Sequence, residues 1–452
     1  MKHQSLTLSY WVGCSTAFAT LTATTASSLD FFAPNGRVAG VALPSFDPIV
    51  AAESLLLQGA GLGTGPLVVD GQIGTLVSPP VIDRSFAVYE NAAGTYDLPA
   101  TGIALSTGDV STHGSGPDNE DQFTSGSFFE AGTTDPLNQQ LLDDLLGPGI
   151  DVFDVTRADL LVATTQGRDK LLISFAFATE EAPEFLGEFT DSFGFFVDGV
   201  NRAVIQGSTI GAQEYDEAVT GFDFAGNDVT TLISSGETFE FDIIATPETE
   251  LDGVLQTNDA AGSNLFRVGG PLVTPASNGL GFVADLNFLI ADVGDEALDS
   301  TVYLADLRAV FNGDTTLNDT IDADDIDALF DAVDAGSLDQ VFDINFDSFI
   351  DAADIDALIQ GVLGTVYGDL DLDGDVDLTD QWILESHLFQ PGEWADGDLD
   401  GDGLVTFSDF DILNNNRGFG TGGGLAPLPE PTTALFGGVF APLLLRRRAS
   451  RA

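Results

Sequence analysis

Hydrophobic and polar residues alternate in short runs between residues 29 and 310. Typical runs are 85–90 (SFAVYE), 171–178 (LLISFAFA) and 300–311 (STVYLADLRAVF), and Gly, Asp, Asn and Pro separate them. Alternation with a period of two, broken by turn residues, is typical of short strands with one buried face. No helical period of any length stands out, so we predict a mainly β fold for this region, a jelly-roll-like β-sandwich.

The hydrophobic pattern changes after residue 310. Apolar residues now recur at third and fourth positions, as in Ile355, Leu358, Ile359 and Val362, which places them on one face of a helix. Similar helical stretches follow three other segments that are rich in aspartate. We therefore predict small α-helical units between residues 311 and 417, each preceded by an acidic loop.

The most acidic segment, 369–380 (DLDLDGDVDLTD), has oxygen-bearing side chains at the spacing of a calcium-binding loop. Counted from Asp369, carboxylates occupy positions 1, 3, 5, 9 and 12, and Gly374 occupies position 6. Calcium takes roughly six to eight oxygen ligands, a glycine allows the sharp turn around it, and position 7 offers its backbone carbonyl. The ligands predicted for this third loop are Asp369, Asp371, Asp373, Asp375 (carbonyl), Asp377 and Asp380.

The same arrangement recurs 29 residues later and also upstream. In the fourth loop, 398–409, Gly403 occupies position 6, and the predicted ligands are Asp398, Asp400, Asp402, Leu404 (carbonyl), Thr406 and Asp409. In the second loop, 343–354, Ser348 replaces the glycine, and the predicted ligands are Asp343, Asn345, Asp347, Phe349 (carbonyl), Asp351 and Asp354.

The first loop, 314–325, departs furthest from the calcium pattern. Thr316 and Asn318 occupy positions 3 and 5, and Asp319 replaces the glycine at position 6. We expect this loop to bind calcium least well. In the third and fourth loops we expect the apolar residues at position 8, Val376 and Val405, to point inward and pair with each other.

The repeated order of loop and helix, with no helix leading into the loop, resembles the dockerin type I module. An aspartate at position 12 agrees with this resemblance, which implies calcium as the cofactor and a cohesin-like protein as a partner. Cohesin contacts in that family fall at positions 10 and 11, here Leu378, Thr379, Phe407 and Ser408. Many secreted proteins carry such modules without a cohesin, and we favour that reading.

Several phrases of the N-terminal region resemble the choice-of-anchor L domain of secreted bacterial proteins over about residues 48–310. They are TGIALSTGDV, LLISFAFATEEAPEF, FTDSFGFFVDGV and FLIADVGDEALDSTVYL, in this order. The resemblance implies a surface location but no known activity. A carbohydrate-binding or adhesive role, with exopolysaccharide as ligand, therefore remains an alternative.

The acids of these phrases raise the question of catalysis. Glu180 and Glu181 are adjacent, so on a strand they point to opposite faces and cannot form the carboxylate pair of a glycoside hydrolase. We expect no enzyme activity and regard a glycoside hydrolase as the least favoured alternative. A structural cation site is the better hypothesis, and it would join Glu181 or Glu184 with Asp292, Asp295 or Asp299.

Both ends of the chain carry targeting patterns. Residues 1–28 combine Lys2, an apolar run and small residues, as in a secretory signal peptide. Residues 429–452 contain Pro-Glu-Pro, an apolar stretch too short to span a bilayer, and three arginines, and this tail resembles the PEP-CTERM sorting signal. The resemblance implies an exosortase-type processing enzyme, transient membrane contact and the cell surface of a Gram-negative-type bacterium.

These patterns predict six segments in the chain. They are a signal peptide (1–28), the choice-of-anchor L-like domain (29–310), two dockerin-like pairs (311–364 and 365–417), a Gly/Pro linker (418–428) and the sorting tail (429–452).

Composition narrows the function further. The formal net charge is −58, and the only lysines are Lys2 and Lys170, so we exclude a nucleic-acid partner. We expect an exported, surface-sorted, non-catalytic calcium-binding protein with a structural or interaction role. The folding of 311–417 should then depend on calcium, since the ion offsets repulsion among the carboxylates.

Overall fold

The computed structural model describes residues 298–420 without interruption and much of the chain before them. The earlier described residues are 30–33, 36–37, 55–56, 62–64, 68–70, 85–91, 95–108, 110, 136–149, 152–164, 167–180, 191–211, 229–234, 237–245, 251, 253–256, 263–277, 279 and 281–293. The predicted signal peptide, the sorting tail and most of the linker lie outside these ranges. None of the helices within them is long and apolar enough to cross a membrane.

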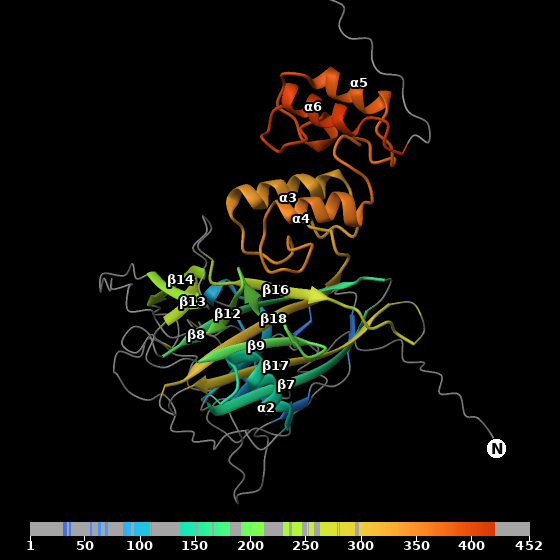
Figure 1. Cartoon of the computed structure of the whole chain (residues 1–452). Coiled ribbons are helices and arrows are strands. Elements are labelled where there is room, and N and C mark those ends of the chain that lie inside the picture. Colours follow the sequence, from blue (N-terminus) through green and yellow to red (C-terminus); the bar gives the residue numbers. More distant parts are fainter. Residues whose placement is uncertain are drawn as a thin grey trace, which may run out of the picture.

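Two antiparallel sheets make up most of the described chain before residue 311 (Figure 1). The larger sheet has the order β13-β14-β15-β8-β18-β6-β5-β1-β2, and β16 also pairs with β8. Its strands are β1 Asp30–Ala33, β2 Gly36–Arg37, β5 Phe86–Glu90, β6 Thr101–Ser106, β8 Lys170–Thr179, β13 Val229–Ser234, β14 Glu237–Ala245, β15 Gly253–Gln256, β16 Phe266–Pro271 and β18 Ser300–Val310.

The smaller sheet has the order β11-β12-β9-β17-β7-β3, with β10 on β9 and β4 on β7. Its strands are β3 Leu62–Thr64, β4 Val68–Asp70, β7 Val152–Thr164, β9 Ser192–Val197, β10 Val200–Asn201, β11 Val204–Ile205, β12 Ser208–Gly211 and β17 Val283–Val293. The prediction of a mainly β fold is therefore confirmed for the described residues.

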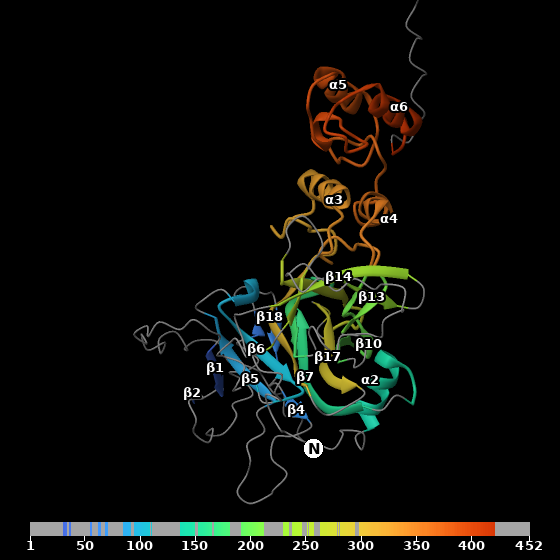
Figure 2. The same ribbon diagram turned by 90° about the vertical axis from the view of Figure 1, so that its left-hand side faces the viewer.

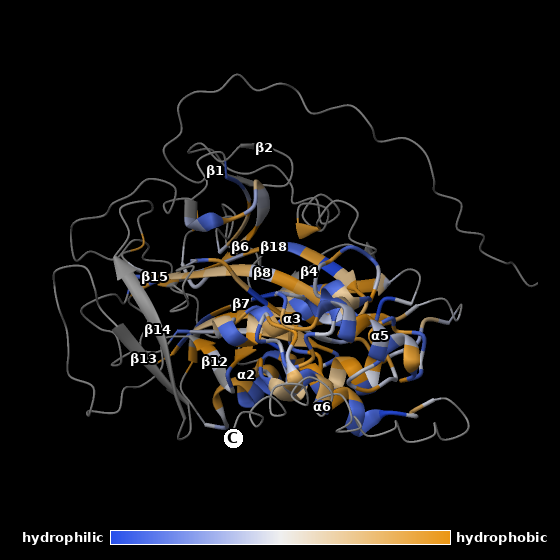
Figure 3. Ribbon diagram, turned by 90° about the horizontal axis from the view of Figure 1, so that it is seen from above, coloured by the Kyte–Doolittle hydropathy of each residue, from blue (hydrophilic) through white to orange (hydrophobic). Residues whose placement is uncertain are grey.

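Strand β8 lies at the centre of the larger sheet because both of its faces are apolar. All ten of its residues are buried, and its ribbon is hydrophobic along most of its length (Figure 3). One face belongs to a core shared with the smaller sheet, in which the rings of Phe175 and Phe193 have centroids 5.3 Å apart. The other face carries Ala176 and Ala178, which pack with buried tyrosines such as Tyr303.

A helix within the β-rich region corrects one expectation. Helix α2 (Pro136–Leu146) was not anticipated, although Leu141, Leu142 and Leu145 recur at helical spacing. These leucines are buried against Phe196 and Leu289 of the smaller sheet. The helix is short and lies among strand-like runs, so its helical spacing is hard to recognise in a region where most residues alternate.

The chain from residue 311 to 420 forms four loop–helix units that lead away from the sheets (Figures 1 and 2). One hydrophobic cluster runs through all four, from Ile326 to Leu413. The helical segments of the described chain, besides α2, are η1 Thr95–Asp97, α3 Ala323–Ala335, α4 Ala352–Asp356, which continues into the π-helical η3 Ala357–Val362, α5 Leu378–His387, η4 Trp394–Asp396 and α6 Phe407–Asn416.

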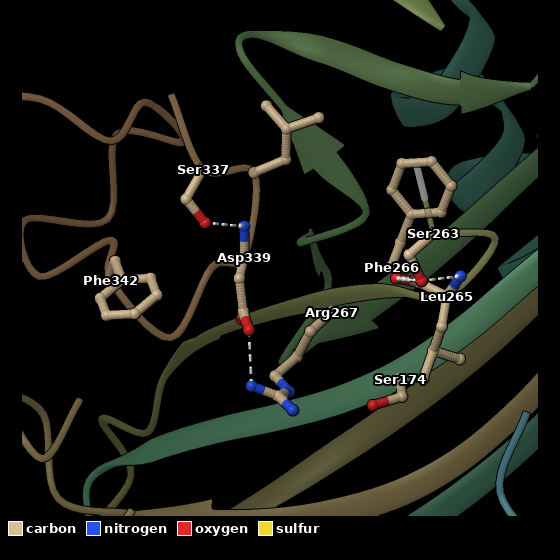
Figure 4. A pocket seen from close by; sticks show the side chains of 9 residues that line it. Ser174, Ser263, Leu265, Phe266, Arg267, Ser337, Asp339 and Phe342 are labelled. Atoms are coloured by element: carbon tan, nitrogen blue, oxygen red, sulfur yellow. Dashed lines mark hydrogen bonds and ion pairs between the residues drawn. The ribbon is translucent and has the colours of Figure 1, made fainter. Parts of the chain in front are cut away.

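The first two loop–helix units rest on the larger sheet. Arg267 of β16 forms an ion pair with Asp339, with 2.6 Å between Nη1 and Oδ2, beside an interdomain cavity of about 250 Å³ (Figure 4). Lys170, at the start of β8, is buried and donates to the carbonyl oxygens of Val341 at 2.9 Å and Asp343 at 2.6 Å. Burial lowers the pKa of Lys170 to about 8, against the opposing attraction of Asp343. The single lysine of the described residues thus anchors the start of the second loop.

Candidate metal-binding loops

All four loops are closed by the carboxylate at position 1. This aspartate is buried in each loop and accepts a hydrogen bond from the backbone N–H of position 6 at 2.7 to 3.0 Å. The bond pulls the turn back over the start of the loop. The four residues are Asp314, Asp343, Asp369 and Asp398.

The carboxylate at position 12 joins each loop to its helix. One oxygen accepts from the backbone N–H of position 9 at 2.8 to 2.9 Å, and the other accepts from position 2 or 3 at 2.8 to 2.9 Å. Position 9 is also the helix N-cap, so the two residues form a capping box that fixes where the helix begins. The four residues at position 12 are Asp325, Asp354, Asp380 and Asp409.

The third and fourth loops bring their predicted ligands together. Ligand atoms of Asp369, Asp371 and Asp380 all lie within 4.8 Å of one another, and those of Asp398, Asp400 and Asp409 do the same. A further group, Asp375, Asp377 and Asp380, shares the last carboxylate of the third loop. Such groups can hold a hard cation, because its oxygen ligands surround it at about 2.3–2.6 Å.

The surroundings of the buried carboxylates in these two loops disfavour their ionised form. Burial raises the pKa of Asp369, Asp380 and Asp398, backbone N–H donors partly offset the rise, and neighbouring aspartates add to it. Asp373 adds to the rise at Asp369, and Asp409 adds to the rise at Asp398. The loops are therefore unfavourable places for anions unless a positive charge joins them.

The position-5 carboxylates hold the N–H of position 7, the residue whose carbonyl is a predicted ligand. Asp373 accepts from the N–H of Asp375 at 3.1 Å, and Asp402 accepts from that of Leu404 at 2.9 Å. In the second loop Asp347 accepts from Phe349 at 2.9 Å. The three residues with predicted carbonyl ligands are thus held at their N–H groups in the same way.

The second loop keeps the backbone of the pattern with fewer charges. Asn345 at position 3 donates to Asp347 at 2.9 Å, and Ser348 adopts the left-handed conformation, φ 70°, that glycine has in the later loops. Burial raises the pKa of Asp343 to about 6, although Lys170 opposes the rise. In this loop Lys170 and the Asn345 amide already offset part of the negative charge, and the third loop has no such groups at these positions.

The first loop is compensated still further by the protein. Asp319 at position 6 has φ 68° and forms an ion pair with Arg168 at 2.5 Å. Thr316 at position 3 donates to Asp325 at 2.9 Å, so this hydroxyl already satisfies a carboxylate that a cation would otherwise bind. That the first loop is the weakest calcium site stays a prediction.

The backbone pairing at position 8 differs from the sequence prediction. Val376 and Val405 are buried in one cluster, as expected, but their main chains do not pair with each other. Val376 bonds to Gly418 and Phe419, which follow α6, whereas Val405 bonds to Phe389 and Gln390, which follow α5. Each loop is thus completed by the segment that follows the other loop's helix.

Glycines that precede the loops are structural residues that the sequence analysis missed. Gly368 and Gly397, directly before position 1, have φ of 108° and 111°, and a Cβ on either would lie 3.0 Å from the Cα of a core leucine, Leu413 or Leu384. Gly313 occupies the same place before the first loop. The repeated Gly-Asp dipeptide was the available signal.

The acids proposed for a site in the β-rich region are only partly described. Glu181, Glu184 and Asp295 lie outside the described residues, whereas Asp292 and Asp299 are buried.

Comparison with protein-family models, curated proteins and solved structures found no match for this chain.

Replacing Gly368 with alanine tests the contact between the loop and the opposite helix. We expect Gly368→Ala to lower the free energy of unfolding by about 2–4 kcal/mol, since it combines left-handed strain with a clash against Leu413. Gly336→Ala is the matched control, because Gly336 has φ 64° and nothing within 4 Å of its Cβ position; its effect should be about 1 kcal/mol. Urea unfolding followed by tryptophan fluorescence measures both, and equal losses would contradict the predicted contact.

The raised pKa values predict that chelated protein is stabilised by mild acid. Burial raises the pKa of Asp343 and of Asp327, which accepts from Trp394 N–H, from 3.8 to about 6. A raised carboxyl pKa contributes stability that is fully present below pH 3.8 and is lost as the pH rises through about 6. In EDTA the melting temperature at pH 5 should therefore exceed that at pH 7. A melting temperature that falls steadily on acidification in EDTA would refute this assignment.

Proposed function

We propose that the protein is an exported, non-catalytic calcium-binding protein with a structural or interaction role at the cell surface or in the extracellular matrix. Its β-rich region would be a jelly-roll-like sandwich, and residues 311–417 would be two dockerin-like pairs. One observation carries the calcium assignment: two loops with the same backbone geometry each gather three carboxylates within 4.8 Å. Burial and mutual repulsion both leave these carboxylates in need of a cation.

The ligand chemistry favours calcium among the common cations. The loops offer carboxylates, carbonyls and one hydroxyl, Thr406, and hard oxygen ligands of this kind suit calcium or magnesium. Magnesium demands a near-ideal octahedron and retains several waters, whereas a twelve-residue loop with many oxygens adapts to calcium. We therefore assign calcium to the third and fourth loops and a weaker site to the second.

The ion would act on structure in this proposal. The carboxylates at positions 1 and 12 are held by backbone N–H donors, an arrangement that suits ligands more than acids or bases that exchange protons with a substrate. Calcium bound there would fix the loops at the ends of α5 and α6 and stiffen the part of the chain between the sheets and the tail. Export and sorting to the surface are inferred from the sequence of both ends.

A second candidate function, docking to a cohesin-like partner, is favoured by exposed apolar side chains. Leu378 and Phe407, both at loop position 10, are 58% and 62% exposed, and Trp382 on α5 is 71% exposed. Contiguous exposed apolar side chains are typical of interaction surfaces. Phe407 also packs edge-on against the exposed Phe389, with 5.2 Å between ring centroids.

Calcium titration of the full chain tests the main proposal. Calcium added after EDTA should raise the melting temperature and change the fluorescence of the buried Trp394, which bonds to the Asp369 carbonyl. Asp380→Asn should weaken binding at the third loop by about 10-fold or more, because this carboxylate belongs to both of its acidic groups. Asp411→Asn, an exposed acid on α6, is the control and should bind as the wild type does. Calorimetry that detects no calcium uptake would rule out the proposal.

Binding of a purified cohesin-type domain tests the second candidate. In calcium, Phe407→Asp should weaken binding by about 10-fold or more, since it replaces an exposed ring that packs against Phe389 with a charge. Val273→Asp, a substitution at a residue 67% exposed in the β-rich region, is the control. Absence of binding by the wild type, or equal losses in both variants, would remove docking from consideration.

A further inference from the structure

Four buried acids lie where strands of both sheets end, separate from the four loops. In the smaller sheet Ala291 pairs with Ser192, so the next residues, Asp292 and Asp191, face each other across β17 and β9. In the larger sheet Ser300 pairs with Thr179, and beyond this pair the N–H of Glu180 donates to the carbonyl of Asp299 at 3.0 Å. Each sheet therefore ends in a cross-strand pair of acids.

Asp191 is the least compensated member of this group. It is 0% exposed, and neither of its carboxylate oxygens makes a hydrogen bond of ordinary geometry within the described residues. Burial raises its pKa to about 7; Ser300 and Asp292 oppose the rise, and the charge of Asp299 adds to it. A buried carboxylate whose donors do not offset the cost of burial is costly in free energy unless a proton or a cation neutralises it.

The atoms around Asp191 are oxygens with unused capacity as ligands. The Ser192 hydroxyl is buried and has no hydrogen-bond partner within the described residues, and the buried Ser300 hydroxyl lies close enough to Asp191 to oppose the rise in its pKa. The Asp299 carboxylate lies so close to Gly108 that a Cβ there would come within 1.8 Å of Oδ2, so its position is tightly set. The Glu180 carboxylate accepts from the N–H of Asp299 at 3.2 Å and helps to hold this strand end.

We propose that Asp191, Asp292 and the Ser300 hydroxyl, with the charge of Asp299 beside them, hold a calcium ion that ties the ends of the two sheets together. The donors are all hard oxygens, as calcium requires, and they come from the residue before β9, from β17 and from the start of β18. The site is independent of the loops, because none of its ligands belongs to residues 311–417. The rival occupant is a proton shared between Asp191 and Asp292.

The experiment compares calcium content and sheet stability in full-length variants. Equilibrium dialysis with elemental analysis counts bound calcium, and far-ultraviolet circular dichroism follows melting of the sheets with calcium and with EDTA. Asp191→Asn should bind about one ion fewer than the wild type, and the calcium-dependent rise in sheet melting, about 5 °C or more in the wild type, should disappear. Asp285→Asn, an exposed acid on the same strand as Asp292, should match the wild type.

A loop variant separates this site from the proposed function. The double variant Asp380→Asn/Asp409→Asn should lose calcium from the third and fourth loops and yet retain the calcium-dependent rise in sheet melting. If sheet melting in this variant is the same in calcium and EDTA, the proposal is overturned even if Asp191→Asn fails to fold. Asp191→Asn with undiminished calcium content and undiminished stability in calcium would overturn it in favour of the shared proton.

Discussion

The structure depends on how buried carboxylates are compensated. The aspartates at positions 1 and 12 are almost fully buried in all four loops, and backbone N–H groups close each loop around them. These hydrogen bonds fix the geometry, but they are dipoles and leave the net charge in place. Full ionisation of these carboxylates inside the protein therefore requires a positive charge nearby. The four loops have nearly the same backbone geometry and differ mainly in the source of that charge.

The source of positive charge changes with the distance of the loop from the sheets. In the first loop Arg168 pairs with Asp319, and in the second loop Lys170 reaches the carbonyl of Asp343. Lys170 begins β8 and Arg168 lies just before it, so the strand that organises the larger sheet also supports the loops that rest on it. The third and fourth loops lie far from that strand (Figures 1 and 2). At position 3 they carry the carboxylates of Asp371 and Asp400, where the first and second loops carry a threonine and an asparagine. We infer that an external ion supplies in the second pair the charge that the protein supplies in the first.

The local features of this region could be predicted from sequence, because loop position, turn and helix start all lie within twelve residues. Residues 314, 343, 369 and 398 begin loops with one geometry, and the helices begin where the apolar period changes. Features that join distant segments could not be predicted in this way. Nothing in the spacing of Val376 and Val405 reveals that their main chains pair with Phe419 and Phe389, and nothing in the neighbourhood of Asp191 reveals that it faces Asp292 across two strands. Helix α2 was missed for a different reason, since its eleven residues are outnumbered by strand-like runs on either side.

The exchange of segments within the second pair makes its two loops one cooperative unit. The third loop is completed by Gly418 and Phe419, which follow the fourth loop's helix, and the fourth loop is completed by Phe389 and Gln390, which follow the third loop's helix. The glycine before each loop packs against a leucine of the opposite helix in the same reciprocal way. Neither loop can take its closed form unless the helix after the other loop is in place. An ion bound in one loop, as proposed above, would therefore order the other loop through the backbone and couple the two proposed sites without any contact between the ions.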